Sequence, residues 1–595
     1  MGALVLGGCL GGSDLASAPP ALTQGAPPSC PVGEVQARGA CTPAAEAYAP
    51  SGTAYVVAGR DSRASDANPG TEERPWATLA HAARTLRPGD AVLVRGGVYR
   101  ESIEPVRGGT DADHRITYAA YPGERVVVTG ADRIPDGWTS LGEGLWRRPW
   151  TFPAWAAYSD DPVFRRELVV AAGRVLRAVH SRQALRPGTQ WVAGTDLAPT
   201  TLTVSLPGTV RPDDVEVATR ARLFWPVASR PDAPCGDASQ PAWLRVAGFT
   251  FRHASNRAQW GALCAGSAHG VIEDVTVEWT VGQGVDGSGR GHVFRRVRSD
   301  YNGQLGWGAA CTDCLFEEGS AVGNNWAGHD PFWEAGGGKW SRTRGSVIRR
   351  FYVADNHGPG LWLDGTNRQN TLEGNRVVRN EVAGILLELE TTETLVQHNV
   401  VEATRWREWS GSGILSQAAS RNLLLHNTIV GNDGTGLWLR LDPLRRAPDV
   451  GSVVVANRVE GNARTADEAR EIAVEAADER SRRSHRFAAN RYGRPSGDPV
   501  LLSTFFLSPV GSGDYRGSDL ATWSRLTGDR GSMLVPEGLV DLRRRPSLPR
   551  IGAVSAPPRL SAEVGAAAER VRAAPTAGSS GSRSAPRPSS RGSRP

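Results

Sequence analysis

Lys339 is the only lysine in a chain whose lysine and arginine residues together number 68, and it follows Glu334 in the stretch EAGGGKWSRT. An ammonium group can lose its proton when it is desolvated and can then act as a base, whereas a guanidinium stays charged at ordinary pH. A sequence that uses arginine for almost every positive charge would have a chemical reason to place a lysine here. We interpret Lys339 as a candidate catalytic base.

Four similar segments follow this lysine, GLWLD, GILLE, GILSQ and GLWLR, and they end at Asp364, Glu388, Gln417 and Arg440. Alternate residues of a strand face opposite sides. The leucine and isoleucine side chains flanking the centre of each segment would then point into the protein, and the last residue would point outward. The pattern predicts a column of polar side chains on one face, with Asp364 next to Glu388.

Counting back along the same repeat places Glu334 in the column of Asp364 and Glu388, with Lys339 on the loop that leaves Glu334. Carboxylates on strands about 4.8 Å apart repel one another, so one should have a raised pKa unless a cation lies between them. Lys339 is one candidate cation, and Ca²⁺ is another because it binds clustered carboxylate oxygens. We predict that these four residues are catalytic and that the three carboxylates are the ligands if calcium binds. The competing interpretation is a solvated charged column.

Tryptophan is concentrated around these residues, with eight of the 19 tryptophans between residues 307 and 438. Rings exposed beside polar groups can stack on sugars, and long loops on a rigid scaffold commonly carry binding residues. Trp333 faces inward on the strand pattern, and His357 is either a site residue or a turn histidine. The predicted substrate-binding residues are Trp362, Trp438, Trp406, Trp340, His329 and Arg440.

The elements that must position these residues form a repeat. The segments NRVVRN, NVVEAT, NTIVGN and NRVEGN begin at Asn375, Asn399, Asn427 and Asn457, and FYVADN from Phe351 fits the same register. Short β-branched strands that recur every 24 to 30 residues, without a helical period, indicate a parallel β-helix. The four asparagines would stack as a ladder of amide hydrogen bonds along the coil axis, which gives them a structural role.

The start of the chain fits this fold. Residues 54–101 predict a strand, a polar loop, a short helix with Leu79, Ala83 and Leu86 on one face, and a further strand. Such a helix can cover the open first coil, whose edge would otherwise invite aggregation. Together with RITYAAYPGERVVVTGAD at residues 115–132, this opening resembles the right-handed parallel β-helix proteins of the pectin-lyase-like superfamily, which include chondroitinase-B-like polysaccharide lyases and several groups of glycoside hydrolases.

The resemblance covers residues 54–132 and about 243–510. It implies an all-β, right-handed parallel β-helix that cleaves a polysaccharide, with an acidic polymer and β-elimination favoured. In the lyases of this superfamily a lysine base removes the C5 proton of a uronic acid, calcium or another cation holds the carboxylate, and an arginine assists. Lys339 matches the base, and Arg368 and Arg440 are candidate arginines.

Two alternatives come from other functional classes. A glycoside hydrolase would use one of Asp364 and Glu388 as the acid and the other as nucleophile or base, with retention of configuration if the two lie near 5 Å apart and inversion if they lie further apart. A non-catalytic surface protein would bind glycan through the tryptophan face, and Lys339 would then only pair with Glu334.

Composition divides the chain into six parts. The predicted parts are a leader and linker (1–52), an N-terminal cap with the first coils (53–132), an inserted β-rich subdomain (133–242), the main β-helix with the site (243–510), a closing segment (511–554) and a tail (555–595) rich in Ala, Pro, Ser and Arg that cannot form a core.

Cysteine placement indicates an oxidising compartment. The start MGALVLGGC resembles the lipobox of bacterial lipoproteins, which would put the lipid on Cys9. The other six cysteines fall into three close pairs that we predict to be disulfides, Cys30 with Cys41, Cys235 with Cys264, and Cys311 with Cys314. We expect a secreted protein, or one anchored by lipid at the bacterial cell envelope.

Charge and hydropathy limit the classes of partner that we expect the protein to bind. The net charge of +6 comes with no recognised nucleic-acid-binding motif, so we expect no nucleic-acid partner. No apolar run of 18 residues is present, and membrane contact is expected only through the lipid anchor. We expect a monomer whose partner is its polysaccharide substrate and which needs no cofactor other than calcium.

Overall fold

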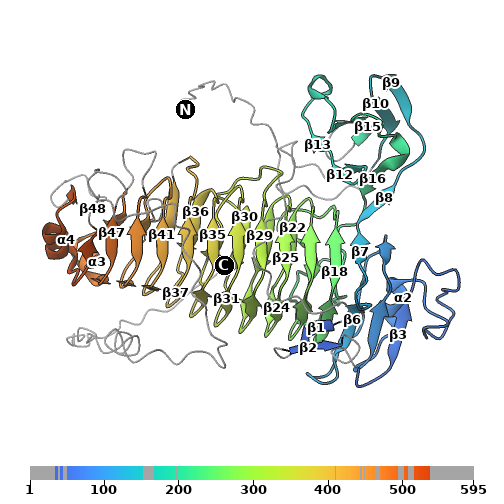
Figure 1. Ribbon diagram of the computed structural model, residues 1–595, viewed down its shortest axis with the longest axis horizontal. Helices are drawn as coiled ribbons and strands as arrows, with labels where there is room; N and C mark the ends of the chain where they lie inside the picture. Colours follow the sequence, from blue (N-terminus) through green and yellow to red (C-terminus); the bar gives the residue numbers. More distant parts are fainter. Residues whose placement is uncertain are drawn as a thin grey trace, which may run out of the picture. The chain divides into compact units, whose positions relative to one another are not determined.

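The computed structural model describes residues 50–151, 167–194, 199–408, 410–442, 445, 447, 449–462, 470–493, 502–506 and 515–535, together with the backbone of residues 34–37 and 40–43. Within these residues the chain winds into a parallel β-helix (Figure 1). The all-β prediction is confirmed. Cys9 and the tail from residue 555 lie outside the described residues.

Three long sheets of almost entirely parallel strands form the coils. Sheet 1 runs from β3 (Ala54–Val57) to β46 (Arg486–Ala488), and sheet 2 from β5 (Gly97–Tyr99) to β50 (Met533–Leu534). Sheet 3 carries three of the four predicted catalytic residues, Lys339, Asp364 and Glu388. Its strands are β19 (Gly261–Cys264), β22 (Gln283–Asp286), β26 (Leu305–Ala309), β30 (Gly336–Ser341), β33 (Leu361–Asp364), β36 (Val382–Glu388), β39 (Gly411–Gln417), β42 (Leu437–Arg440), β45 (Ile472–Ala476), β48 (Leu502–Phe506) and β49 (Tyr515–Gly517).

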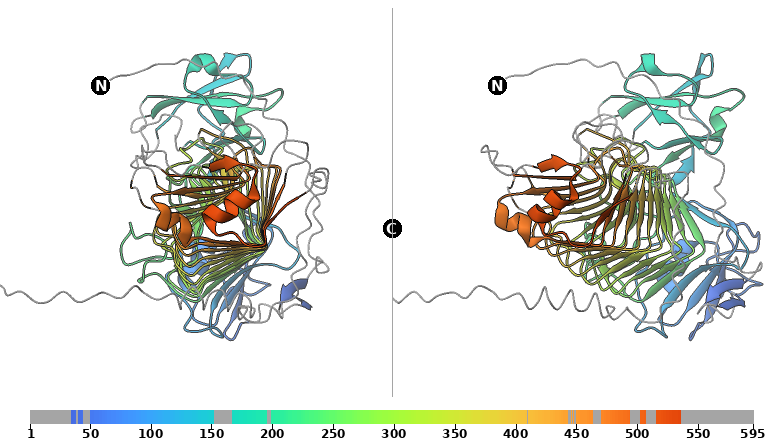
Figure 2. Two further views of the ribbon diagram at one scale, coloured as in Figure 1. Left: turned by 90° about the vertical axis from the view of Figure 1, so that its left-hand side faces the viewer. Right: turned by 60° about the vertical axis from the view of Figure 1, so that its left-hand side comes forward.

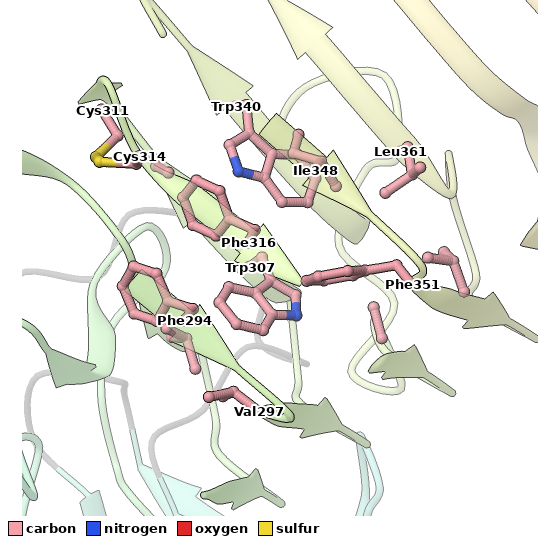
Figure 3. Packing of buried hydrophobic residues seen from close by; sticks show 14 of the residues in the cluster. Phe294, Val297, Trp307, Cys311, Cys314, Phe316, Trp340, Ile348, Phe351 and Leu361 are labelled. Carbon is pink, nitrogen blue, oxygen red and sulfur yellow. A yellow bond between two sulfur atoms is a disulfide. The ribbon is translucent and has the colours of Figure 1, made fainter. Parts of the chain in front are cut away.

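The interior of the coils is filled by columns of aliphatic and aromatic side chains, one from each coil. Phe294 and Phe316 stack with ring centroids 5.0 Å apart, Trp307 and Trp340 pack edge-on against this pair, and Phe351 packs against both tryptophans (Figure 3). Leu361 and Leu363 are fully buried in the same core, as the strand alternation predicts. The core therefore fixes which face of each sheet 3 strand points outward.

The predicted asparagine ladder is present. Asn375 Nδ2 donates to Asn399 Oδ1 at 2.9 Å, Asn399 Nδ2 donates to Asn427 Oδ1 at 3.0 Å, and the chain of bonds continues through Asn457 to Asn490. Each amide oxygen also accepts the backbone N–H of the preceding asparagine, so buried polar groups at this turn are satisfied coil after coil. A second ladder that the sequence reading missed joins Asn302, Asn324, Asn356 and Asn380.

The short helix predicted near the start is α2 (Leu79–Thr85). Thr78 caps it, because its hydroxyl accepts the backbone N–H of His81. Leu79, Ala83 and the adjoining Leu86 are buried in the main core, which confirms the predicted apolar face.

The insert forms two small sheets with a hydrophobic core of its own, which includes Trp150, Val192 and Leu202. The prediction placed it over residues 133–242, and the described strands lie between Ala131 and Ala218. After them Phe224 bridges to Ile103 and Leu263, so the chain has rejoined the coils by that point. The strands are β8 (Ala131–Arg133), β9 (Thr139–Gly142), β10 (Leu145–Pro149), β11 (Val169–Ala171), β12 (Arg174–Val175), β13 (Arg177–Ala178), β14 (Thr189–Gly194), β15 (Pro199–Ser205) and β16 (Val215–Ala218).

The C-terminal end of the coils carries two helices, α3 (Glu479–Ser484) and α4 (Leu520–Thr527), which Figure 2 shows in front of the stacked coils. Trp523 of α4 is fully buried and packs edge-on against Phe487 of the last coils. No helix in the described part of the chain is long and apolar enough to cross a membrane.

Two of the three predicted disulfides are formed. Cys235 bonds to Cys264, and Cys311 bonds to Cys314. The third predicted pair lies outside the described side chains, because Cys30 is not described and only the backbone of Cys41 is.

Candidate active site

The strands of sheet 3 bring the predicted carboxylates side by side. In the parallel register Leu363 of β33 pairs with Leu387 of β36, so the next residues, Asp364 and Glu388, are neighbours on adjacent coils. Glu388 pairs in turn with Gln417, and Gln417 with Arg440. The polar column predicted from the four repeated segments is therefore present.

The register upstream differs from the expected one. Ser341, and not Glu334, pairs with Asp364, while Lys339 pairs with Trp362. Lys339 lies on β30 and not on a loop. The miscount arose because the glycine run before Lys339 is part of the strand itself: a Cβ at Gly337 would lie 2.5 Å from the carbonyl oxygen of Gly360 on the next coil.

Glu334 nevertheless joins the group, because Lys339 holds it there. Lys339 Nζ lies 2.9 Å from Glu334 Oε1 and 2.8 Å from Asp364 Oδ2, and it donates to the carbonyl oxygen of Trp333 at 3.2 Å. The ammonium also lies 3.9 Å from the centre of the Trp362 ring. Only 5% of the Lys339 side chain is exposed. The cation is therefore held in a closed set of contacts between two carboxylates.

Among the described residues no cation contacts Glu388, which is held by neutral donors. Trp362 Nε1 donates to Glu388 Oε2 at 3.0 Å, and Gln417 Nε2 donates to Glu388 Oε1 at 3.2 Å. Burial, followed by the negative charge of Asp364, raises the pKa of Glu388 to about 7, against the opposing effect of Lys339 and the Trp362 hydrogen bond. Burial also raises the pKa of Glu334, although Lys339 opposes that shift.

Asp364 differs from Glu388 in its two oxygens. Oδ2 is bound by the Lys339 ammonium, whereas Oδ1 is buried and has no hydrogen-bond partner among the residues that the structure describes. A carboxylate with one oxygen held by a cation and the other without a hydrogen bond from the described residues can act as a nucleophile once a substrate reaches that oxygen. Glu388, protonated up to about neutral pH, is suited to act as an acid. The two neighbours therefore differ in the chemistry available to them.

The burial of the tryptophans differs from the prediction. Trp340 is fully buried because it pairs with Leu363, whose side chain fills the interior, so its assignment to substrate binding is wrong. Trp362 is only 3% exposed, since it lies under Lys339 on the outer face and packs with Leu386. These two rings are therefore closed to a sugar.

The remaining predicted binding residues lie around the column. Trp406 is 40% exposed, and Trp438 is partly buried beneath the Arg440 guanidinium, 4.7 Å from its ring centre. Trp333, expected to face inward, is 39% exposed. His329 is buried, and its backbone N–H donates to the side-chain oxygen of Asn325. Its side chain therefore packs inside the loop and is not exposed on the loop surface.

His357 belongs to a separate polar group. Its Nδ1 lies 3.0 Å from Glu381 Oε1, and Arg407 Nη1 lies 2.7 Å from Glu381 Oε2. Glu381 precedes β36 at the end opposite Glu388. His357 therefore does not join the carboxylates of the column.

The three carboxylates predicted as calcium ligands do not fit that ion. The ammonium of Lys339 already lies between Glu334 and Asp364, and both oxygens of Glu388 accept neutral hydrogen bonds. Within the described ranges, no group of three or more His, Cys, Asp or Glu side chains is arranged to hold a metal ion. Calcium binding stays a prediction that this arrangement does not favour.

Sequence reasoning missed the partners that set the state of Glu388. Gln417 was placed in the column, and its register to Glu388 was available from the segment GILSQ, but its hydrogen bond was not foreseen. The contact of Lys339 with the Trp333 carbonyl had no sequence signal, because it depends on how the loop before β30 folds back.

Comparison with known proteins assigns the fold of the coiled region. Residues 260–442 match the family model of the right-handed β-helix region. The chain is a right-handed parallel β-helix protein. This is the fold that the resemblance implied.

Three similar proteins match this β-helix protein at low identity or over part of its length. Uncharacterized protein YwoF of Bacillus subtilis (strain 168) is 42% identical over 66 residues, which are 11% of this chain and 14% of YwoF. The structure of XylC in complex with xylose aligns over 81% of this chain and 82% of its own, at 17% identity and a TM-score of 0.51. A structure named as a glycoside hydrolase aligns over 83% and 98%, at 14% identity and a TM-score of 0.38. At these identities the structural similarity concerns the fold alone.

Proposed function

We propose that this protein is a carbohydrate-active enzyme, a retaining glycoside hydrolase in which Asp364 is the nucleophile and Glu388 is the general acid and base. The observation that carries the proposal is the pair of neighbouring carboxylates in different environments, one bound to Lys339 and one held protonated up to about pH 7. Two carboxyl groups whose surroundings separate their protonation states are what glycoside hydrolysis requires.

The reaction would proceed in two displacements. In the first, Asp364 Oδ1 attacks the anomeric carbon, the glycosidic C–O bond breaks, and the proton of Glu388 passes to the leaving oxygen. In the second, the Glu388 carboxylate takes a proton from water, the resulting hydroxide attacks the anomeric carbon, and Asp364 leaves. Lys339 would stabilise Asp364 as the ionised nucleophile before attack and as the leaving carboxylate afterwards.

The spacing of the strands supports retention of configuration. Asp364 and Glu388 occupy neighbouring positions on adjacent parallel strands, which lie about 4.8 Å apart. Retaining enzymes place their two carboxyl groups about 5 to 5.5 Å apart, whereas inverting enzymes leave about 6.5 to 9.5 Å for a water molecule.

The contacts of Lys339 favour hydrolysis over the β-elimination expected from the superfamily resemblance. A lyase base must reach and accept the proton of the substrate, and Nζ of Lys339 is already bound by two carboxylates within 2.9 Å. Lys339 and Arg440 are the cations in the described part of the column, and both already bind carboxylates.

The disulfides support a location outside the cytoplasm. Cys235–Cys264 and Cys311–Cys314 would persist in a secreted or envelope protein and would be reduced in most cytosols. The polysaccharide substrate would then be met at the cell surface or outside it.

The test is the product spectrum. The purified protein is incubated with a panel of neutral and acidic polysaccharides and oligosaccharides, including xylose-containing ones, and new reducing ends, ultraviolet absorbance and the anomeric configuration of the first product are followed together. Reducing ends with retained configuration and no absorbance are expected. An increase in ultraviolet absorbance would overturn the proposal in favour of β-elimination. If none of the three signals changes, the alternative of a non-catalytic glycan-binding protein would replace it.

A further inference from the structure

Gln417 and Arg440 continue the column beyond Glu388, and their hydrogen bonds run in one direction. Arg440 Nη1 donates to Gln417 Oε1 at 3.1 Å, and Gln417 Nε2 donates to Glu388 Oε1 at 3.2 Å. A glutamine amide can present either its oxygen or its NH₂ group to a neighbour. A guanidinium can only donate, so Arg440 binds the oxygen end, and the NH₂ end must face Glu388.

We infer that Arg440 is a positioning residue of this site: by fixing the amide of Gln417 it ensures that both oxygens of Glu388 accept hydrogen bonds from the protein, so that the acid's proton is left for the substrate. The inference rests on the proposed function. It concerns residues that touch Glu388 directly or through one partner, and it gives Gln417 a role as orienting donor.

The alternative orientation of the amide shows why Arg440 matters. With the amide reversed, Gln417 Oε1 would face Glu388 and accept its proton, and the proton would be held in a protein hydrogen bond instead of pointing at the leaving oxygen. The second oxygen of Glu388 is already bound by the indole N–H of Trp362. Arg440 therefore excludes the orientation of the Gln417 amide in which the proton of Glu388 would be bound by the protein.

Arg440 is itself held rigidly. Its guanidinium lies 4.7 Å from the centre of the Trp438 ring, and its Nε lies 3.4 Å from Glu475 Oε2 on the next coil. Gln417 is 9% exposed and the Glu475 side chain 6% exposed. The hydrogen-bond relay from Arg440 through Gln417 to Glu388 therefore lies in a largely desolvated part of the column. Directional hydrogen bonds are strongest in such surroundings.

Several charges face Glu388 and act on its titration. Asp364 on β33 and Asp442 after β42 raise its pKa, and Lys339 on β30 lowers it. Asp442 is paired with Arg445 at 2.8 Å. A donor such as the Gln417 amide favours the ionised form, so its loss should raise the pKa of Glu388 further.

The first experiment compares pH profiles of hydrolysis for the wild type, Gln417→Met and Arg440→Met. We expect both variants to move the alkaline limb of kcat upward by about one pH unit, with kcat reduced and KM little changed. Glu475→Gln removes the carboxylate that Arg440 contacts on the next coil and should leave the alkaline limb of kcat at the same pH. Arg376→Met breaks a comparable ion pair with Glu402 on sheet 2 and controls for loss of any surface-sheet arginine.

A second measurement needs no activity. The pKa of Glu388 is raised in the folded state, so the unfolded state releases this proton first, and the stability contributed by Glu388 should fall between its unfolded pKa near 4.5 and about 7. The difference in Tm between the wild type and Glu388→Gln, followed against pH, reports this window. Its upper end should move up in Arg440→Met and in the double variant Arg440→Met/Glu475→Gln, which leaves no unpaired carboxylate.

Two outcomes separate the inference from the proposed function. A wild type without hydrolytic activity but with the shifted stability window in Arg440→Met overturns the hydrolase and retains the relay. A lower Tm at every pH, with the limb and the window both unmoved in Gln417→Met and Arg440→Met, overturns the relay and leaves Arg440 a structural residue.

Discussion

Asp364 and Glu388 stand next to each other on adjacent strands of sheet 3, yet only Asp364 contacts the cation. Lys339 Nζ lies 2.8 Å from Asp364 Oδ2, whereas Glu388 is bound by an indole and an amide N–H. Burial, followed by the negative charge of Asp364, raises the pKa of Glu388 to about 7, and Lys339, which does not contact Glu388, opposes that shift only in part. The asymmetry of the site comes from this arrangement.

The pH profile should report Glu388. Its pKa is raised to about 7, so the acid is protonated below that pH and lost above it. We expect kcat for hydrolysis to fall as pH rises through about 7. The same limb should be absent from the residual activity of Glu388→Gln, measured with an activated substrate. A limb that persists in that variant would assign it to another group.

The loss of activity in Glu388→Gln should depend on the leaving group of the substrate. General acid catalysis contributes about 10² to 10⁴ in rate, so natural substrates should lose activity by about that factor. Aryl glycosides with acidic phenols need little protonation, and their first step should be much less affected. Rates of glycosylation for a series of phenols measure the difference, and equal losses across the series would contradict the role of acid.

Asp364→Asn should abolish turnover, because an amide cannot form the glycosyl ester. In the wild type a 2-fluoro sugar with a good leaving group should accumulate as a covalent adduct, and the mass of the labelled peptide should place it on Asp364. An adduct on Glu334 or Glu388, or inverted product from the wild type, would reassign the nucleophile or the mechanism.

Lys339→Met should destabilise the protein by about 3 kcal/mol, since it leaves Glu334 and Asp364 near each other without their shared cation. Chemical denaturation measures the free energy of unfolding. Adding Glu334→Gln to this variant should recover part of the loss, because one of the two repelling charges is removed. If the double variant is less stable by the sum of the single effects, the two residues are not coupled.

Asn399→Ala tests the ladder. The substitution leaves the buried backbone N–H and side-chain amide of Asn375 without their acceptor, and we expect a loss of about 2 kcal/mol. Gln369→Ala removes an exposed bond to Glu393 at the same coil spacing and should change the free energy of unfolding by less than about 0.5 kcal/mol. Similar losses in both variants would show that the ladder adds nothing specific.

Much of the fold follows from local patterns. The coil repeat, the inward leucines such as Leu363, the ladder from Asn375 and the capping face of Leu79 are each readable because strand alternation and coil length act residue by residue. The stacking of Asp364 and Glu388 followed from the same count.

Other features depended on how distant segments pack. The strand pattern gives the face of Trp362 but not its burial, because the contacts that cover an outer face come from other coils and loops. Glu334 reached the site through Lys339 and not through the register, and Trp333 was exposed by the fold of its loop.

The sequence by itself determined that this chain is a β-helix with a polar column and one lysine beside it. Only the tertiary structure decided that Lys339 is bound by two carboxylates and that Glu388 holds its proton to about pH 7. The physical reason is that a protonation state depends on burial and on charges within a few ångströms, and residues that meet across coils are separated in sequence by a whole turn of the helix.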